Sequence, residues 1–157
     1  MNSIEISNIL RSNKVTAPYF AGVCSQDELF DFIYPSCQSH KQKRFIIVNT
    51  DIESGRGKHW TSIFLFGNNY CEFFDSLAHD PSYYSKNFLQ FLKCACSKYA
   101  MNTRRIQGQA STMCGEFCIY YCYYRCKGVA FMQIVDRFNA ENLNLNDRKL
   151  QKFIHSM

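Results

Sequence analysis

Residues 107–118 read QGQASTMCGEFC, a loop of small and polar residues that turns into the apolar run 117–124. Cys114 stands at this junction, so the pattern predicts that it is the first residue of a helix. Unpaired N–H groups at a helix start carry partial positive charge, which favours a thiolate over a thiol. The sequence therefore indicates a nucleophilic Cys114, and Gly115 beside it has no side chain to block a substrate.

The run from Cys114 to Cys126 is apolar on nearly every face, which is typical of a buried helix. Cysteines recur at every fourth position of this run, which raises the possibility of a metal site. In a helix the first and last would lie about 18 Å apart, whereas zinc needs sulfurs at about 2.3 Å. We therefore expect no metal here and interpret Cys118, Cys122 and Cys126 as small buried side chains.

The composition is that of a folded chain with a mild positive charge. The 157 residues include 14 Phe, 10 Tyr and 9 Cys, and the formal net charge is +5. This length predicts a single domain over residues 1–157. No apolar run is long enough to cross a membrane, and no secretory signal is recognisable. We therefore expect mostly reduced thiols in a cytosolic or nuclear compartment.

Apolar periodicity predicts an α+β domain. Expected strands are 44–49, 59–66, 70–75 and 104–107, and expected helices are 3–13, 81–100, 114–126 and 130–138. A further short helix is expected to start at 25–28, and a last one to be capped at 146–147. Segment 19–23 is expected to dock as an apolar stretch. The short turn 67–69 predicts that the two strands beside it form an antiparallel hairpin.

Three polar residues fall at element ends where they could join Cys114. His59 begins a strand after a loop with glycines, and Asp75 ends the neighbouring strand. In a hairpin they share one open end, so Asp75 would orient His59 and His59 would act as base toward Cys114. Gln107 could supply an amide N–H which, with the backbone N–H of Cys114, would form an oxyanion hole.

Each of these residues also has a structural interpretation that the pattern leaves open. Cys114 could serve packing, His59 could be a loop histidine, Asp75 a strand-end cap and Gln107 a solvated amide. The remaining histidines stand in loops or polar surroundings without a functional signal, and they are His40, His79 and His155.

The order of these residues resembles that of the adenain family, the cysteine endopeptidases that mature adenoviruses and are related in fold to SUMO-specific proteases. The resemblance rests on HW at 59–60, QG at 107–108 and CG at 114–115, with shorter matches at 18–22, 47–50 and 71–75. It implies an α+β cysteine-protease fold. In that fold a small mixed sheet lies beside a buried central helix that carries the nucleophile, with flanking helices.

The resemblance also implies a role for each candidate residue. Cys114 would be the nucleophile, His59 the base, Asp75 the acid that orients it, and Gln107 the oxyanion donor. Asp75 stands where adenoviral members usually have Glu, and Ser76 follows it where they have Pro. Asp is the residue that SUMO-specific proteases use, so the same chemistry is expected.

A viral thiol protease is the function that the resemblance implies. It would act as a monomer in the virion and host nucleus, cleaving capsid and core precursors at Gly-Gly or Gly-X sites during virion maturation. Such enzymes are stimulated by DNA and by a basic peptide that forms a disulfide with them. Cys96 stands roughly where their partner cysteine lies, and Cys94 is equally near. The basic groups at 41–44, 104–105 and 148–152 would contact viral DNA.

Two other functions remain open at this point. The chain could be a deubiquitinase or SUMO-protease-like enzyme that acts on host conjugates. It could also be a catalytically inactive, DNA-binding component of a virion, although the intact set of Cys, His and Gln side chains argues against that. No membrane partner is expected.

Overall fold

A computed structural model describes residues 1–33, 43–67 and 69–157. Its centre is a five-stranded mixed sheet in the order β1-β2-β3-β4-β5. The strands are β1 (Phe20–Ser25), β2 (Lys43–Asn49), β3 (Trp60–Phe66), β4 (Tyr70–Phe74) and β5 (Lys98–Met101). β2, β3 and β4 are antiparallel neighbours, whereas β1 runs parallel to β2 and β5 runs parallel to β4.

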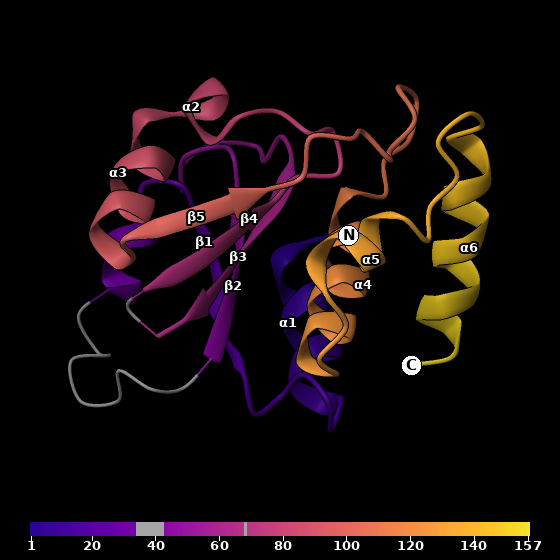
Figure 1. The fold of residues 1–157 in the computed structure, drawn as a ribbon, viewed down its shortest axis with the longest axis horizontal. Helices are drawn as coiled ribbons and strands as arrows, with labels where there is room; N and C mark the ends of the chain where they lie inside the picture. Colours follow the sequence, from indigo (N-terminus) through magenta and orange to yellow (C-terminus); the bar gives the residue numbers. More distant parts are fainter. Residues whose placement is uncertain (34–42, 68) are drawn as a thin grey trace.

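Helices cover both faces of the sheet (Figure 1). One face carries α1 (Ser3–Ser12), α4 (Cys114–Cys126), α5 (Phe131–Val135) and α6 (Asn144–His155). The other carries the short 3-10 helix η1 (Leu29–Phe32) and α3 (Lys86–Ala95), with α2 (Pro81–Tyr84) before it. The predicted α+β class with a mixed sheet and a buried central helix is confirmed.

Apolar side chains alternate between two cores, one on each face of the sheet. In β2, Phe45 and Ile47 face the core beneath α4, whereas Ile46 and Val48 face the core beneath α3. A strand that is buried on both faces reads as a continuous apolar run, which explains the stretch FIIV at 45–48. Packing on both faces therefore holds the sheet in place, and the loops at its edge extend from a rigid support.

α4 is the buried helix on which the rest of its layer packs. It has the predicted bounds, and Cys118, Cys122 and Cys126 are buried as predicted. Tyr121 stacks on Phe74 of β4, with ring centroids 4.5 Å apart and the rings nearly parallel. The first residue of α4, Cys114, is thus placed beside the ends of β3 and β4.

A buried ion pair fastens α4 to the sheet. The side chain of Glu72 in β4 is only 2% exposed, and Arg125 donates to its two oxygens from Nε at 2.7 Å and from Nη2 at 3.0 Å. The hydroxyl of Tyr121 donates to the same carboxylate. Because Arg125 and Tyr121 both belong to α4, these bonds fix how the helix is turned against the strand.

Two predictions for the first half of the chain are incomplete. Segment 19–23 does more than dock, because it forms β1 and pairs with β2. The helix expected to start at 25–28 is the single 3-10 turn η1. His40 lies outside the described residues.

The expected helix 81–100 is divided into α2 and α3, and it ends at Ala95, five residues before the expected end. Ser85 interrupts it by capping α3, since its hydroxyl accepts a hydrogen bond from the N–H of Asn87 at 3.1 Å. After α3 the chain extends and forms β5.

Two expectations for the second half of the chain are also wrong. Residues 104–107 form no strand, because the N–H groups of Ile106 and Gln107 both donate to the carbonyl of Ser76. Asn146 does not cap α6, which begins two residues earlier, at Asn144. The side-chain amide of Asn146 instead donates to the carbonyls of Ile106 and Asn139.

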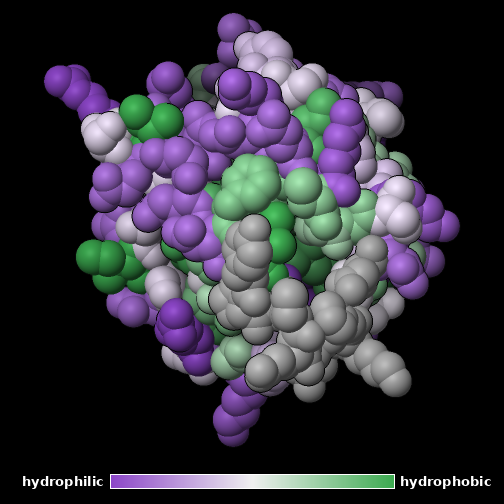
Figure 2. Space-filling view, turned by 90° about the vertical axis from the view of Figure 1, so that its left-hand side faces the viewer, coloured by the Kyte–Doolittle hydropathy of each residue, from purple (hydrophilic) through white to green (hydrophobic). Residues whose placement is uncertain are grey.

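The side of the molecule that carries α3 and η1 has a mixed surface. Figure 2 shows hydrophobic residues gathered near the middle of this side and hydrophilic residues around them. Among the helices that the structure describes, none is long and apolar enough to cross a membrane. Nor do His, Cys, Asp and Glu side chains gather in threes within the described ranges at a potential metal site.

We expect Glu72→Ala to destabilise the fold by about 3–5 kcal/mol, because it leaves the largely buried Arg125 guanidinium without its carboxylate. Urea unfolding followed by circular dichroism measures this loss. Asp136→Ala is the matched control, since it removes an exposed carboxylate from Arg104, and it should cost far less. Equal losses in the two variants would show that the Glu72 pair does not anchor α4.

Candidate active site

The β3–β4 hairpin brings two of the predicted site residues together. β3 and β4 pair from Phe66 with Tyr70 to Ser62 with Phe74, so their open ends are side by side. His59 precedes β3 and Asp75 follows β4, and Nε2 of His59 lies 2.6 Å from Oδ1 of Asp75. His59 is 8% exposed and Asp75 is fully buried.

Cys114 is the first residue of α4, as the sequence predicts. Its sulfur is hydrogen-bonded to the His59 ring. Because Nε2 of that ring bonds Asp75, Nδ1 is the nitrogen that faces the sulfur. The backbone N–H groups of Trp60 and Gly115 also bond to the sulfur. The helix start and the strand start therefore both direct donors at one thiol.

These contacts favour the charged forms of Cys114 and His59. Burial alone raises the pKa of the Cys114 thiol, but the bonds from His59, Trp60 and Gly115 together lower it below its ordinary value. Burial alone lowers the pKa of His59, but the bonds to Asp75 and Cys114 and their charges raise it to about 9. A thiolate and an imidazolium thus coexist between the two pKa values.

Asp75 is held as an ionised carboxylate by several donors. Besides His59, Oδ1 accepts from the N–H of Leu77 at 2.9 Å. Oδ2 accepts from the N–H of His79 at 2.9 Å and from the hydroxyl of Tyr84 at 2.7 Å. Burial alone raises the pKa of Asp75, but these bonds and the charge of His59 lower it overall. The Asp75 carboxylate is therefore held in place as the hydrogen-bond acceptor of His59.

The backbone around Asp75 turns sharply to supply these donors. Ala78 has a φ of 60°, in the left-handed region, and its N–H bonds back to the carbonyl of Asp75. The side chain of Asn102 bonds both the N–H and the carbonyl of Asp75, at 3.0 and 2.6 Å. This turn folds the N–H groups that follow β4 over the carboxylate.

Tyr84 and His79 belong to the site although the sequence carried no signal for them. The Tyr84 ring stacks against the His59 ring with centroids 5.7 Å apart. Nδ1 of His79 lies 3.0 Å from the Tyr84 hydroxyl. The sequence interpretation placed His79 in a loop and Tyr84 on a helix, which is correct for their elements. Their contact with Asp75 depends on the turn at Ala78, and no pattern in the sequence indicated that turn.

Gln107 is buried at the edge of the same site. Its Oε1 accepts from the Ser76 hydroxyl at 2.5 Å, and its Nε2 donates to the carbonyl of Ser111 at 2.8 Å. The second hydrogen on Nε2 has no partner among the residues that the structure describes. No hydrogen bond joins Gln107 to Cys114 within those residues, so an oxyanion role stays a prediction.

Cys96 is placed differently from the expectation that it would be open to a peptide. It forms a disulfide with Cys71, because β5 runs beside β4 and brings the end of α3 against that strand. Cys96 is also buried. The exposed free thiol in this region is that of Cys94.

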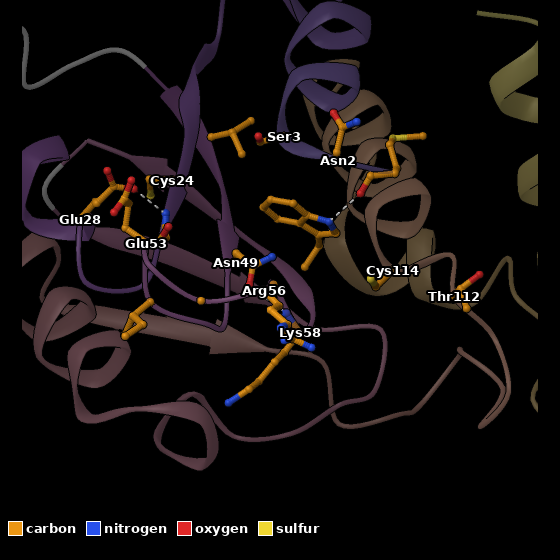
Figure 3. A pocket seen from close by; sticks show the side chains of 17 residues that line it. Asn2, Ser3, Cys24, Glu28, Asn49, Glu53, Arg56, Lys58, Thr112 and Cys114 are labelled. Carbon is orange, nitrogen blue, oxygen red and sulfur yellow. Dashed lines mark hydrogen bonds between the residues drawn. The ribbon is translucent and has the colours of Figure 1, made fainter.

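A pocket of about 590 Å³ opens beside Cys114 (Figure 3). Its walls come from residues 1–3, from 23–28 at the end of β1, and from 49–60. Trp60 holds two of these walls together, since its Nε1 donates to the carbonyl of Met1 at 3.1 Å. Cys114 lies at one end of the pocket and the carboxylates of Glu28 and Glu53 lie together at the other.

Gly115 also serves packing, beside its expected role of leaving the way to Cys114 open. A Cβ at this position would lie 3.3 Å from Ile6, 3.4 Å from Trp60 and 3.5 Å from Met1. The missing side chain therefore lets α1 and Trp60 approach the start of α4. The pocket wall next to the nucleophile depends on that approach.

Several of the basic residues expected at DNA bond the protein itself. Arg104 donates to the carbonyl of Val135 at 2.5 Å, and Nε of Arg105 donates to the carbonyl of Gln107 at 2.8 Å. Lys149 donates to a backbone carbonyl in the same region. Residues 41 and 42 lie outside the described part of the chain. DNA contact stays a prediction.

We expect iodoacetamide to alkylate Cys114 at neutral pH roughly tenfold faster than Cys94, because the hydrogen bonds to its sulfur lower the pKa of the Cys114 thiol. Cys94 is the control, an exposed free thiol on the same chain. His59→Ala should slow the alkylation of Cys114 and leave the alkylation rate of Cys94 unchanged. Mass spectrometry of each thiol from pH 5 to 10 measures both rates. Parallel pH profiles for the two cysteines would contradict the thiolate–imidazolium pair.

Comparison with known proteins finds viral proteases that are similar to this chain. No protein-family model matches the chain. A protease of bovine adenovirus 7 is 26% identical over 149 residues, which cover 79% of this chain and 74% of that protein. A SUMO-1 cysteine protease of African swine fever virus is 26% identical over 116 residues, which cover 68% of this chain. The match spans only 40% of that viral protein.

The fold has counterparts among solved structures. The crystal structure of the African swine fever virus protease matches with a TM-score of 0.69, covering 98% of this chain and 65% of that one. Its sequence identity is 16%, so this likeness concerns the fold alone. This chain is therefore similar in sequence to proteases of adenovirus and African swine fever virus, and it shares its fold with the latter.

Proposed function

We propose that this chain is a thiol endopeptidase in which Cys114 is the nucleophile, His59 the general base and acid, and Asp75 the group that orients His59. The observation that carries the proposal is the continuous chain of hydrogen bonds from Asp75 through His59 to Cys114. Gln107 would be the side-chain donor of an oxyanion hole whose other donor is the backbone N–H of Cys114.

The reaction uses the ion pair directly. The Cys114 thiolate attacks the carbonyl carbon of a peptide bond, a C–S bond forms, and the carbonyl electrons move onto oxygen. The resulting oxyanion takes hydrogen bonds from Gln107 and the Cys114 N–H. The imidazolium of His59 then protonates the leaving amine as the C–N bond breaks, which leaves a thioester on Cys114.

Hydrolysis of the thioester restores the enzyme. Neutral His59 takes a proton from water, the hydroxide adds to the thioester carbonyl, and the C–S bond breaks to release the acid and the Cys114 thiolate. His59 is again an imidazolium beside a thiolate. Asp75 stays ionised throughout and stabilises the charged ring in each half of the cycle.

The pocket beside Cys114 supplies a place for the polypeptide next to the scissile bond. Its volume of about 590 Å³ suits a short extended segment. Trp60 and residues 1–3 form part of its lining, and the hydrogen bond from Trp60 to Met1 joins them. Small residues are expected next to the scissile bond, in agreement with the Gly-Gly or Gly-X sites that the family resemblance implies.

Viral capsid and core precursors are the proposed substrates, cut during virion maturation in the virion and host nucleus. Ubiquitin-like conjugates are the second candidate, favoured by the African swine fever virus relative that is named a SUMO-1 cysteine protease. Both reactions would use the same four residues. They differ in whether a short peptide suffices or a folded ubiquitin-like domain is needed.

Stimulation by DNA and by a basic peptide is proposed from the family resemblance. The choice of the cysteine that would bond such a peptide changes, because Cys96 forms a disulfide with Cys71 whereas Cys94 is free and exposed. We therefore propose Cys94 as the thiol that a cysteine-containing basic peptide would reach.

Replacing Cys114 by Ala should abolish cleavage of a fluorogenic Gly-Gly peptide, because no other thiol faces His59 within the described chain. The control is Cys118→Ala, one turn further along α4, where burial raises the pKa of the thiol far above its usual range. That variant should remain active. Circular dichroism checks that both variants are folded, and cleavage by Cys114→Ala would exclude the proposed nucleophile. SUMO and ubiquitin fusions, assayed beside capsid-precursor peptides, separate the two substrate classes.

The pH dependence of cleavage should be bell-shaped. Activity should appear as pH rises through the lowered pKa of Cys114, which generates the thiolate. It should fall as pH rises through about 9, because neutral His59 no longer protonates the leaving amine. Initial rates of peptide cleavage between pH 4 and 11 measure both limbs. A rate that stays flat above pH 9 would contradict the role of His59 as acid.

A basic peptide with one cysteine, supplied as its symmetric disulfide, should form a mixed disulfide at Cys94 by thiol–disulfide exchange, in which one peptide thiol leaves. Peptide mapping identifies the modified residue, and the cleavage rate with and without peptide and DNA measures stimulation. Cys94→Ser should prevent the adduct, whereas Cys96→Ser is the comparison. An adduct at Cys96 in the unmodified protein would show that the Cys71 disulfide opens and would favour the original expectation.

A further inference from the structure

We infer that Ser76 is a positioning residue for the oxyanion hole, acting through Gln107. This inference rests on the proposed thiol-protease function and adds a residue to it. Ser76 is fully buried and directly follows Asp75, at the end of β4. Its hydroxyl touches neither His59 nor Cys114 in any bond that the structure describes, and instead donates to Oε1 of Gln107.

The hydrogen bonds with Ser76 and Ser111 together fix which way the Gln107 amide points. The amide oxygen and nitrogen lie on opposite sides of Cδ, so a donor on Oε1 turns Nε2 to the other side. There Nε2 donates to the carbonyl of Ser111, which leads into the turn before Cys114. A flipped amide would set Oε1 against that carbonyl and Nε2 against a hydroxyl that must then rotate. The carbonyl of Ser111 can only accept, so it selects this orientation, and the Ser76 hydroxyl holds the amide there by donating to Oε1, with one N–H left for an oxyanion.

The backbone of Ser76 also fixes where Gln107 starts. The carbonyl of Ser76 accepts from the N–H of Ile106 at 2.9 Å and from the N–H of Gln107 at 3.1 Å. Arg105 holds the other side of Gln107, donating to its carbonyl at 2.8 Å. Ser76 thus forms hydrogen bonds to both the backbone and the side chain of Gln107.

One dipeptide consequently orients both halves of the proposed catalytic machinery. Asp75 fixes the His59 ring, and Ser76 fixes the Gln107 amide. Both residues are buried, so neither contact competes with bulk water. Without the hydroxyl, Oε1 of Gln107 becomes a buried acceptor with no donor, and the amide gains freedom to turn away from the carbonyl of the substrate.

The first test is Ser76→Ala, assayed on a peptide that the unmodified protein cleaves. We expect kcat to fall about 10- to 100-fold, somewhat less than loss of an oxyanion donor itself, with KM nearly unchanged. Affinity for a peptide aldehyde should fall by a similar factor, because the hemithioacetal places its oxygen in the oxyanion hole. Alkylation of Cys114 by iodoacetamide should not change, since attack on its CH₂ carbon builds no oxyanion.

Three further variants separate positioning from a merely structural role. Ser76→Thr keeps the hydroxyl and should recover most of kcat. In a Gln107→Ala background, Ser76→Ala should cause no further loss, because the residue through which it acts is gone. Ser62→Ala removes an equally buried serine hydroxyl from β3 and should keep kcat within about twofold.

The outcomes also distinguish this inference from the proposed function. An unmodified protein with neither cleavage nor fast Cys114 alkylation would overturn the protease proposal itself. An active protein whose Ser76→Ala variant keeps its kcat would overturn only the role of Ser76. So would a loss of equal size in the Gln107→Ala background, or an equal slowing of alkylation. Thermal melting identifies any variant that fails to fold, and the Ser76→Thr result then decides.

Discussion

The contact between His59 and Asp75 across the open end of the β3–β4 hairpin is the constraint on which the site depends. It is short, buried and charge-assisted, and it joins residues that are 16 positions apart in sequence. Hydrogen bonds of this kind are among the stronger ones in proteins, and removing one partner leaves a buried charge unpaired. Everything else in the site is arranged relative to this pair. The thiol lies on one side of it, and the turn at Ala78 closes over the other.

Polar and charged contacts at both ends of α4 hold this helix against the sheet. At the start of the helix, the N–H groups and His59 meet the Cys114 sulfur. In its last turn, Arg125 meets the buried Glu72. A negative group at the start and a positive group at the end both match the helix macrodipole. The helix that carries the proposed nucleophile is therefore held in both rotation and position, which a reacting sulfur requires.

Local patterns predicted the parts of this structure that depend on neighbouring residues. The hairpin turn at 67–69 placed His59 and Asp75 together, and the apolar run after Cys114 gave the helix its correct bounds. Contacts between distant segments could not be predicted in the same way. The pairing of Cys96 with Cys71 follows from the parallel course of β5, which the helical spacing of residues 81–100 concealed. Tyr84 reaches Asp75 only because of a left-handed residue in the intervening turn.

The hydrogen bond from Trp60 to the carbonyl of Met1 makes the first turn of α1 a wall of the pocket. That turn is held by a reciprocal cap between Asn2 and Glu5. The first turn of a helix can open locally at a far smaller free energy than whole-domain unfolding. The width of the pocket thus depends on whether the first turn of α1 is folded. Changes far from the thiol that fray this turn would alter how well a substrate is held while the melting temperature of the domain stays the same.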